Sequence, residues 1–338
     1  MEVILDVGIR IILFLQGLGA WLLAPMRLLT FLGEVEFYLL LMPALYWCWD
    51  AGLGLRLGVL LMVSGGLNDA LKIALHRQRP FWIDQRVQAL GVETNFGFPS
   101  GHAQHGISFW GRLAQASGRS WAWPAALVLA FLIGLSRLYL GLHFPHSLVV
   151  GWAVGALILW AFLRWERPVS RWLRRRTYRE HLLIAFCASL ALFGLSVLSL
   201  VSAGDWQVPE EWAQAALASV GEPIDPLSPR YALISAGVLF GMGAGAAWQS
   251  RAGGFRADGP TVKRLVRYLL GVAVLGALWF GLDAVVPDDG SMLSWALQYL
   301  SAALAGAWVT AGAPALFLRL RLADREGGAG GGTEGATG

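Results

Sequence analysis

Residues 182–202 read LLIAFCASLALFGLSVLSLVS and residues 291–318 read SMLSWALQYLSAALAGAWVTAGAPALFL, and neither stretch contains a charged side chain. A helix of about 20 apolar residues spans the hydrocarbon core of a bilayer. Across all 338 residues only 14% are charged and 56% are hydrophobic, whereas soluble domains carry about 25% charged residues. The sequence therefore predicts an all-α polytopic membrane protein and excludes a soluble globular domain.

Apolar runs between charged flanks predict nine helices, at 34–50, 54–75, 99–115, 120–138, 144–164, 181–203, 230–250, 264–286 and 291–318. Residues 7–31 form either a tenth span or an interfacial helix, because Gly17 and Gly19 interrupt their uncharged run. This pattern predicts an N-terminal helical core, a basic cytoplasmic linker, a four-helix C-terminal extension and a disordered Gly-rich tail. Their expected bounds are 1–166, 167–180, 181–322 and 323–338.

Basic and acidic residues alternate between successive connections. Seven arginines lie between residues 164 and 180, and five Lys or Arg residues lie between 251 and 267, whereas 205–225 and 283–289 are acidic. Because cytoplasmic loops are enriched in Lys and Arg, we expect the basic connections and the C-terminus to be cytoplasmic. The same count places connections 76–98 and 138–143 on the outer face, in what we expect to be a bacterial inner membrane.

Four predicted helix ends meet at that outer face. Helix 54–75 ends just after Lys72 and is followed by Arg79, and the next helix begins Pro-Ser-Gly-His at residues 99–102. Arg137 ends the third helix and His143 precedes the fourth. Up-and-down topology therefore brings the following side chains to one membrane interface: Lys72, Arg79, His102, Arg137 and His143.

These residue types suit a phosphate group. Fixed cations neutralise a phosphate dianion, and an arginine offers it a bidentate fork. A helix N-terminus that begins Pro-Ser-Gly adds free backbone N–H groups. Two histidines can divide the nucleophile and proton-donor roles. Because the histidines have few carboxylates nearby and no cysteine partner, we expect no metal and no cofactor. The residues predict metal-independent phosphoryl transfer.

Three short motifs make the pattern more specific. They are Lys72-IALHRQ-Arg79-Pro80, Pro99-Ser100-Gly101-His102 and Ser136-Arg137-LYLGL-His143. In this order and at this spacing, they resemble the signature of the type 2 phosphatidic acid phosphatase superfamily. That family includes lipid phosphate phosphatases, polyprenyl-diphosphate phosphatases and glucose-6-phosphatase. Its six-helix core would cover about residues 7–166.

The resemblance implies a role for each position. His143 would attack phosphorus and form a phosphohistidine, and His102 would protonate the leaving oxygen and later help to activate water. The phosphoryl oxygens would be held through a charge-dispersed transition state by the following residues: Lys72, Arg79, Ser100, Gly101 and Arg137.

One position departs from the family pattern. Most members carry an aspartate four residues after the attacking histidine, where this chain has Ser147 in the stretch HFPHS. An orienting carboxylate fixes the histidine tautomer, and its loss costs about 10⁴-fold in a serine-protease triad. Three interpretations compete: the Ser147 hydroxyl takes over, a carboxylate from Asp69, Asp84 or Glu93 reaches in, or catalysis is slow or absent.

Other polar residues have simpler interpretations. His105 lies one turn deeper than His102 and is expected to pack, and His146 is expected at the interface, with a substrate or orienting role as the alternative. Asp69, three residues before Lys72, is expected to pair with that lysine and is also a candidate supporting residue. Gly241 and Gly245 have small-xxx-small spacing, which is compatible with tight packing or with a homo-oligomer formed through the C-terminal helices.

We therefore expect outward-facing dephosphorylation of a lipid phosphate or a lipid diphosphate such as undecaprenyl diphosphate. The expected partners are the bilayer and this substrate, with no nucleic acid. Two enzyme alternatives are a sugar-phosphate phosphatase, which the HFPHS stretch favours, and a lipid phosphotransferase. A lipid-phosphate binding protein or transporter without turnover is the alternative from another class.

Overall fold

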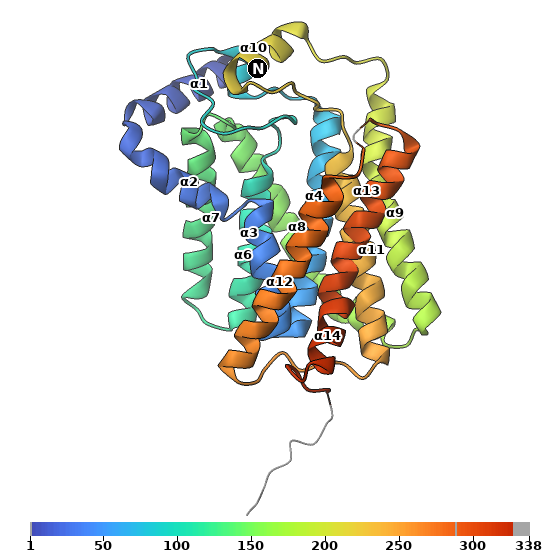
Figure 1. Ribbon diagram of the computed structural model, residues 1–338. Coiled ribbons are helices and arrows are strands. Elements are labelled where there is room, and N and C mark those ends of the chain that lie inside the picture. The colour runs from blue at the N-terminus through green and yellow to red at the C-terminus, as the bar shows by residue number, and fades with distance from the viewer. Residues whose placement is uncertain (1, 288, 327–338) are drawn as a thin grey trace, which may run out of the picture.

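The computed structural model describes residues 2–287 and 289–326, and in these residues it contains helices and no strand (Figure 1). The all-α polytopic architecture predicted from the sequence is confirmed. The part of the predicted disordered tail from 327 to 338 lies outside the described residues. The α-helices are α1 Glu2–Gly17, α2 Leu23–Phe31, α3 Val35–Cys48, α4 Ala51–Leu75, α5 Pro80–Ile83, α6 Gly101–Ser117, α7 Ala122–Tyr139, α8 Pro145–Leu173, α9 Tyr178–Ala203, α10 Glu210–Val220, α11 Arg230–Arg251, α12 Thr261–Asp283, α13 Met292–Ala307 and α14 Ala313–Arg319.

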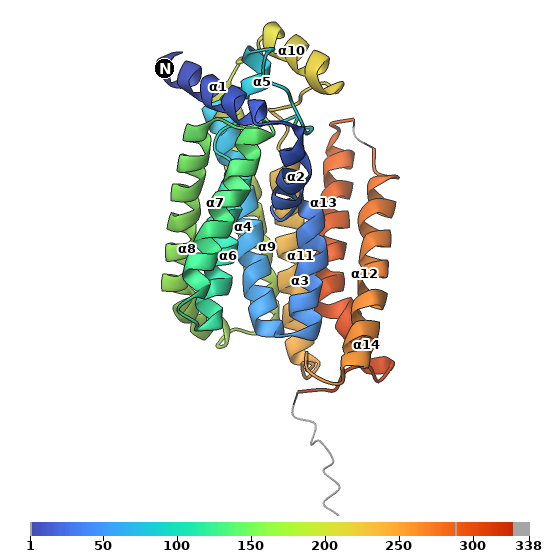
Figure 2. The ribbon, with the colours of Figure 1, turned by 90° about the vertical axis from the view of Figure 1, so that its left-hand side faces the viewer.

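Most of these helices run side by side as a bundle, whereas α1, α5 and α10 lie across one end of it (Figure 2). Among the described residues, seven helices are long and apolar enough to cross a membrane, or eight if the bent pair of α1 and α2 is one span. The protein is therefore an integral membrane protein. The nine helices predicted from the sequence are all present in the described residues, and two of them, α3 with 14 residues and α6 with 17, are shorter than the seven long apolar helices.

The N-terminal region is bent. The axes of α1 and the following helical segment 20–31 differ by 89° at the break, where Gly19 has a φ of 107°. A residue with a side chain would be strained at this φ, whereas glycine adopts it readily. Ile9 and Ile12 of α1 are buried in a cluster with Trp82 of α5. This arrangement agrees better with an interfacial helix than with a straight tenth span.

Two segments expected to be connections are helical. Residues 210–220 form α10, whose buried Ala216 packs in the same cluster as Trp82. Helix α8 continues to Leu173, beyond the expected end at 164, so the first half of the basic linker is helical. Arginine is a good helix former, and an exposed, charged helix end leaves no hydrophobic signal in the sequence.

The C-terminal extension packs closely through glycines. A Cβ at Gly241 of α11 would lie 1.9 Å from the carbonyl oxygen of Ala303 of α13, and one at Gly245 would lie 2.2 Å from the hydroxyl oxygen of Thr310. The small-xxx-small face of α11 is therefore used for tight packing inside the chain. Helix α9 of the extension also contacts α4 of the core. The Ser196 hydroxyl of α9 donates to Asp69 of α4 at 3.2 Å and so links the extension to the core.

Replacing Gly241 with alanine tests this packing. The added methyl group would force α11 and α13 apart, so we expect a lower melting temperature in detergent for Gly241→Ala. The control is Gly276→Ala on α12, where a Cβ would meet nothing within 4 Å and alanine is the better helix former. Equal melting temperatures for the two variants would contradict the close α11–α13 contact.

Candidate active site

Four segments converge at the end of the bundle covered by α1, α5 and α10, which we call the site end. Lys72 lies in the last turn of α4, and Arg79 directly precedes α5. Arg137 lies in the last turn of α7, and His143 lies in the short connection to α8. All four side chains are buried, and each follows or ends a helix whose apolar residues fix it in the bundle. The side chains of the three sequence motifs are thus brought together, as the topology predicted.

Arg79 is completely buried and is held by the loop 84–100 and by the α7–α8 connection. Its Nε donates to the carbonyl of Asn95 at 2.7 Å, and one terminal nitrogen donates to the carbonyl of Leu142 at 2.9 Å. The same nitrogen lies 3.4 Å from His143 Nε2. The other terminal nitrogen contacts Glu93, the Asn95 side chain and the carbonyl of Phe96. Protein acceptors therefore satisfy this guanidinium.

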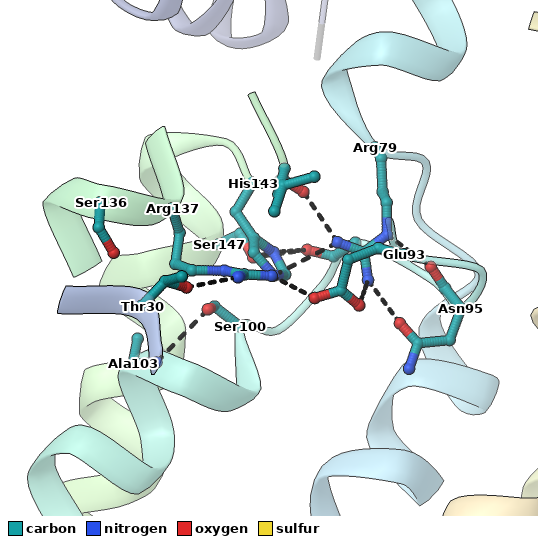
Figure 3. Close-up of polar contacts among 12 residues, drawn as sticks. Thr30, Arg79, Glu93, Asn95, Ser100, Ala103, Ser136, Arg137, His143 and Ser147 are labelled. Atoms are coloured by element: carbon teal, nitrogen blue, oxygen red, sulfur yellow. Dashed lines mark hydrogen bonds and ion pairs between the residues drawn. The ribbon is translucent and has the colours of Figure 1, made fainter. Parts of the chain in front are cut away.

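Glu93 lies between two arginines (Figure 3). One of its oxygens accepts from Arg79 at 3.0 Å, and the other accepts from Arg137. Arg137 also donates to the Thr30 hydroxyl of α2 at 2.6 Å, and Lys72 donates to the Asn95 side chain at 2.9 Å. The carboxylate thus lies between the cations, where the sequence predicts that a phosphate group binds.

Electrostatics keep Glu93 ionised. Burial alone would raise its pKa, but the charges of Arg79, Arg137 and Lys72 outweigh burial and hold the pKa well below the usual range. Three cations and one carboxylate leave an excess of positive charge in this region. A phosphate dianion that enters would complete the neutralisation, in place of or beside Glu93.

His143 is oriented by a backbone carbonyl. Its Nδ1 lies 2.8 Å from the carbonyl oxygen of Gly97, which can only accept, so Nδ1 carries the hydrogen. Nε2 of the neutral ring is then free of a proton and faces Arg79. Burial, followed by the charges of Arg79 and Arg137, lowers the pKa of His143 well below its ordinary value, which favours this neutral form.

Ser147 supports the same carbonyl. Its hydroxyl donates to the Gly97 oxygen at 2.6 Å and lies 3.3 Å from His143 Nδ1. Among the described residues, the contacts of Nδ1 are this carbonyl and this hydroxyl, with no carboxylate. The contact to Nδ1 that was expected from an aspartate at position 147 is therefore made by the Gly97 carbonyl oxygen, which Ser147 also contacts.

The start of α6 presents His102. Ser100 is fully buried and caps the helix, since its hydroxyl accepts the N–H of Ala103 at 3.4 Å. Gly101 opens the helix, where the first N–H groups have no intrahelical acceptor. The Nε2 of His102 is buried and has no hydrogen-bond partner among the described residues. A Cβ at Gly33 would lie 2.5 Å from the His102 ring, so this glycine makes room for it.

Four other candidates lie away from His143 Nδ1. Asp69 faces the extension and bonds Ser196, and Asp84 bonds Arg86. His146 stacks on Phe144 at 5.3 Å between ring centroids, and His105 packs edge-on against Tyr38 at 6.4 Å. In the part of the chain that the structure describes, no group of three or more His, Cys, Asp or Glu side chains could hold a metal ion.

Sequence reasoning missed several contacts of this site. Thr30, Asn95 and the Gly97 carbonyl contact the cations and His143. Asn95 and Gly97 come from a loop without a helical pattern, and Thr30 comes from α2, which is far from the three motifs in the sequence. Glu93 was considered only as an orienting carboxylate. The polar run Glu93-Thr-Asn95 directly before Phe96 was the available signal, because loop residues beside a functional motif are often functional themselves.

Comparisons with known proteins agree with this geometry. Residues 53–171 match the model of the PAP2 superfamily, the type 2 phosphatidic acid phosphatases. Residues 233–325 match the model described as "PAP2 superfamily phosphatase, transmembrane extension". The chain therefore contains a PAP2 superfamily domain, as its three motifs indicated, followed by a PAP2 transmembrane extension.

Curated relatives are phosphatases at modest identity. The chain is 30% identical to glucose-6-phosphatase 3 of Homo sapiens over 185 residues, which are 47% of the chain and 53% of the relative. It is 26% identical to undecaprenyl-diphosphatase of Sulfolobus acidocaldarius over 107 residues, which are 31% of the chain and 52% of that relative. It is 27% identical to phosphatidylglycerophosphatase B of Bacillus subtilis over 171 residues, or 45% and 78%.

The matched region spans about half the length of the first two of these relatives. No solved structure matches the chain at a significant level. The matches show similarity to a phosphatase family. The substrate has to be inferred from the site itself.

Replacing Glu93 tests its role between the arginines. Glu93→Gln leaves two buried guanidinium groups without their counter-charge, and removing one partner of a buried ion pair costs about 3–5 kcal/mol. We expect a lower melting temperature at neutral pH. Because the pKa of Glu93 in the folded protein lies well below 4.5, the stabilisation is full above that pH and is lost as the pH falls through the folded-state pKa.

The difference in melting temperature between wild type and Glu93→Gln should therefore stay constant from neutral pH to about pH 5 and shrink only in stronger acid. Glu211→Gln, on the exposed surface of α10, is the matched control. A difference that already shrinks between neutral pH and pH 5 would contradict the ion pairs with Arg79 and Arg137.

Proposed function

We propose that the protein hydrolyses a lipid phosphate or lipid diphosphate at the outer membrane face through a phosphohistidine on His143. The supporting observation is the hydrogen bond from His143 Nδ1 to the carbonyl of Gly97. This bond leaves Nε2 as the nucleophilic nitrogen and directs it toward the arginine cluster. Only that tautomer can attack phosphorus from the position that the ring occupies.

In the first step the phosphoryl group binds among Lys72, Arg79 and Arg137 and draws their donors away from Glu93 and Asn95. His143 Nε2 forms a bond to phosphorus as the bond from phosphorus to the leaving oxygen breaks. His102, in its protonated form, gives its proton to that oxygen. The cations stabilise the charge spread over the equatorial oxygens.

In the second step a water molecule attacks the phosphohistidine. The bond from phosphorus to Nε2 breaks, the water proton passes to His102, and inorganic phosphate leaves with its fourth P–O bond formed by the water oxygen. Both histidines then return to their starting protonation states. A second lipid hydroxyl in place of water would make the protein a phosphotransferase, the alternative that shares every residue of this scheme.

The location of the site favours a lipid substrate, because it lies at the end of a bundle of helices that are long and apolar enough to cross a membrane. A sugar phosphate is the second candidate, favoured by the 30% identity to glucose-6-phosphatase 3. Phosphate release from glucose 6-phosphate, measured with and without a competing polyprenyl phosphate in detergent, separates the two. Hydrolysis of glucose 6-phosphate alone would reject the lipid proposal.

The covalent intermediate gives the first direct test. Wild-type protein quenched during turnover of a ³²P-labelled lipid phosphate should carry acid-labile, base-stable label on His143, and His143→Ala should release phosphate at a rate lower by at least about 10³-fold. His146→Ala is the matched control, because this histidine lies three residues away and stacks on Phe144. Turnover without label, or label on another residue, would contradict the mechanism. Binding without turnover in wild type would favour the binding-protein alternative.

Ser147→Ala tests how His143 is oriented. The Gly97 carbonyl still accepts from Nδ1 in this variant, so kcat should fall by no more than about tenfold, far less than the loss of an orienting carboxylate. KM should stay unchanged because Ser147 does not contact the cations. A loss near 10⁴-fold would mean that the hydroxyl, and not the carbonyl, is the orienting group.

A further inference from the structure

The phosphate region opens into one long cavity. Its volume is about 1130 Å³, above the range of about 300–1,000 Å³ typical of small-molecule sites. Lys72, Arg137 and His143 lie in its wall, so the cavity is continuous with the candidate active site. A phosphate group, even with a sugar attached, would leave most of this space empty.

Both halves of the protein contribute walls. The core provides α3 and α4, and the extension provides α11, α12 and α13 (Figure 2). On α4 the lining residues recur on one face from Gly54 to Lys72. At 1.5 Å per residue this stripe is roughly 27 Å long, close to the thickness of a bilayer core. The cavity is therefore elongated along the helix axes.

The chemistry of the wall changes along this length. Charged residues lie at the site end, and farther along the lining residues are mostly apolar, such as Leu61 of the core and Val238 and Leu278 of the extension. Of the chain's six methionines, Met42, Met62 and Met242 line the cavity. Methionine fills irregular space and adapts to a flexible apolar ligand.

Aromatic residues join the core to the extension near the far end of the cavity, where Tyr46 and Val309 lie in its wall. The Trp47 indole of α3 donates to the carbonyl of Val309 at 2.7 Å, and Trp308 donates to the carbonyl of Gly271 on α12 at 3.0 Å. Tyr46 donates to the carbonyl of Thr310 at 3.2 Å. These bonds join core and extension, and the space is polar at the site end and mostly apolar at the other end.

We infer that the C-terminal extension, together with α3 and α4, forms a binding site for the linear hydrocarbon chain of the lipid phosphate substrate. This inference rests on the proposed function, because the headgroup of the same molecule occupies the site end. A single elongated chain, as in a polyprenyl phosphate, follows the long axis of the cavity. The extension then sets the chain-length preference of the enzyme.

Filling the cavity from the extension tests this site. In Val238→Trp the indole occupies the apolar part and leaves the catalytic residues untouched. We expect KM for undecaprenyl phosphate to rise at least tenfold. For geranyl phosphate, kcat/KM should change less than about twofold, because its short chain stays near the site end. Val201→Trp, at a position 71% exposed on α9, is the matched control and should behave as wild type.

Binding in a non-turnover background separates this inference from the proposed function. His143→Ala protein should bind radiolabelled undecaprenyl phosphate, and the double variant with Val238→Trp should bind it at least tenfold more weakly. Equal binding by both overturns the chain site, whatever the wild type hydrolyses. Retained binding contrast without wild-type hydrolysis overturns only the proposed function. If Val238→Trp loses turnover of geranyl phosphate, the variant is misfolded. Leu278→Trp on α12 then replaces it, with the same expected results.

Discussion

Two buried guanidinium groups beside one another at the end of a membrane bundle have to be neutralised. Arg79 and Arg137 are 0% and 2% exposed, and an uncompensated buried charge costs several kcal/mol. The Glu93 carboxylate and the carbonyls of the loop 84–100 provide this compensation. The loop is therefore packed against the cations, and its Gly97 carbonyl is thereby positioned to orient His143. The same electrostatic demand gives a phosphate dianion its binding energy.

Hydrogen bonds and close helix packing link the core to the extension. Asp69 of α4, in the helix that carries Lys72, accepts a hydrogen bond from Ser196 of α9. Trp47 and Tyr46 of α3 donate to the backbone that follows α13. Close glycine contacts then hold α11 against α13. The extension thus has a fixed position relative to the cations, as a shared substrate cavity requires.

The sequence predicted the helical architecture well, because long uncharged runs have one stable structure in a bilayer. It also predicted which side chains of the three motifs would meet, since they lie at successive helix ends. It could not predict that a carbonyl replaces the expected aspartate, because every residue has a carbonyl and only the loop path selects Gly97. The position of Glu93 between Arg79 and Arg137 likewise depends on that path. The helix α10 was missed because eleven residues with polar flanks give a weak periodic signal.

A structure of the protein with orthovanadate, which adopts the geometry of phosphoryl transfer, tests the central claim most directly. The account predicts vanadium bonded to His143 Nε2, vanadate oxygens on Lys72, Arg79 and Arg137, and Nδ1 still donating to the Gly97 carbonyl. At least one of the arginine hydrogen bonds to Glu93 should be replaced by a hydrogen bond to a vanadate oxygen. Vanadate bound elsewhere, or bound among the arginines with His143 Nδ1 and not Nε2 toward the metal, would contradict it.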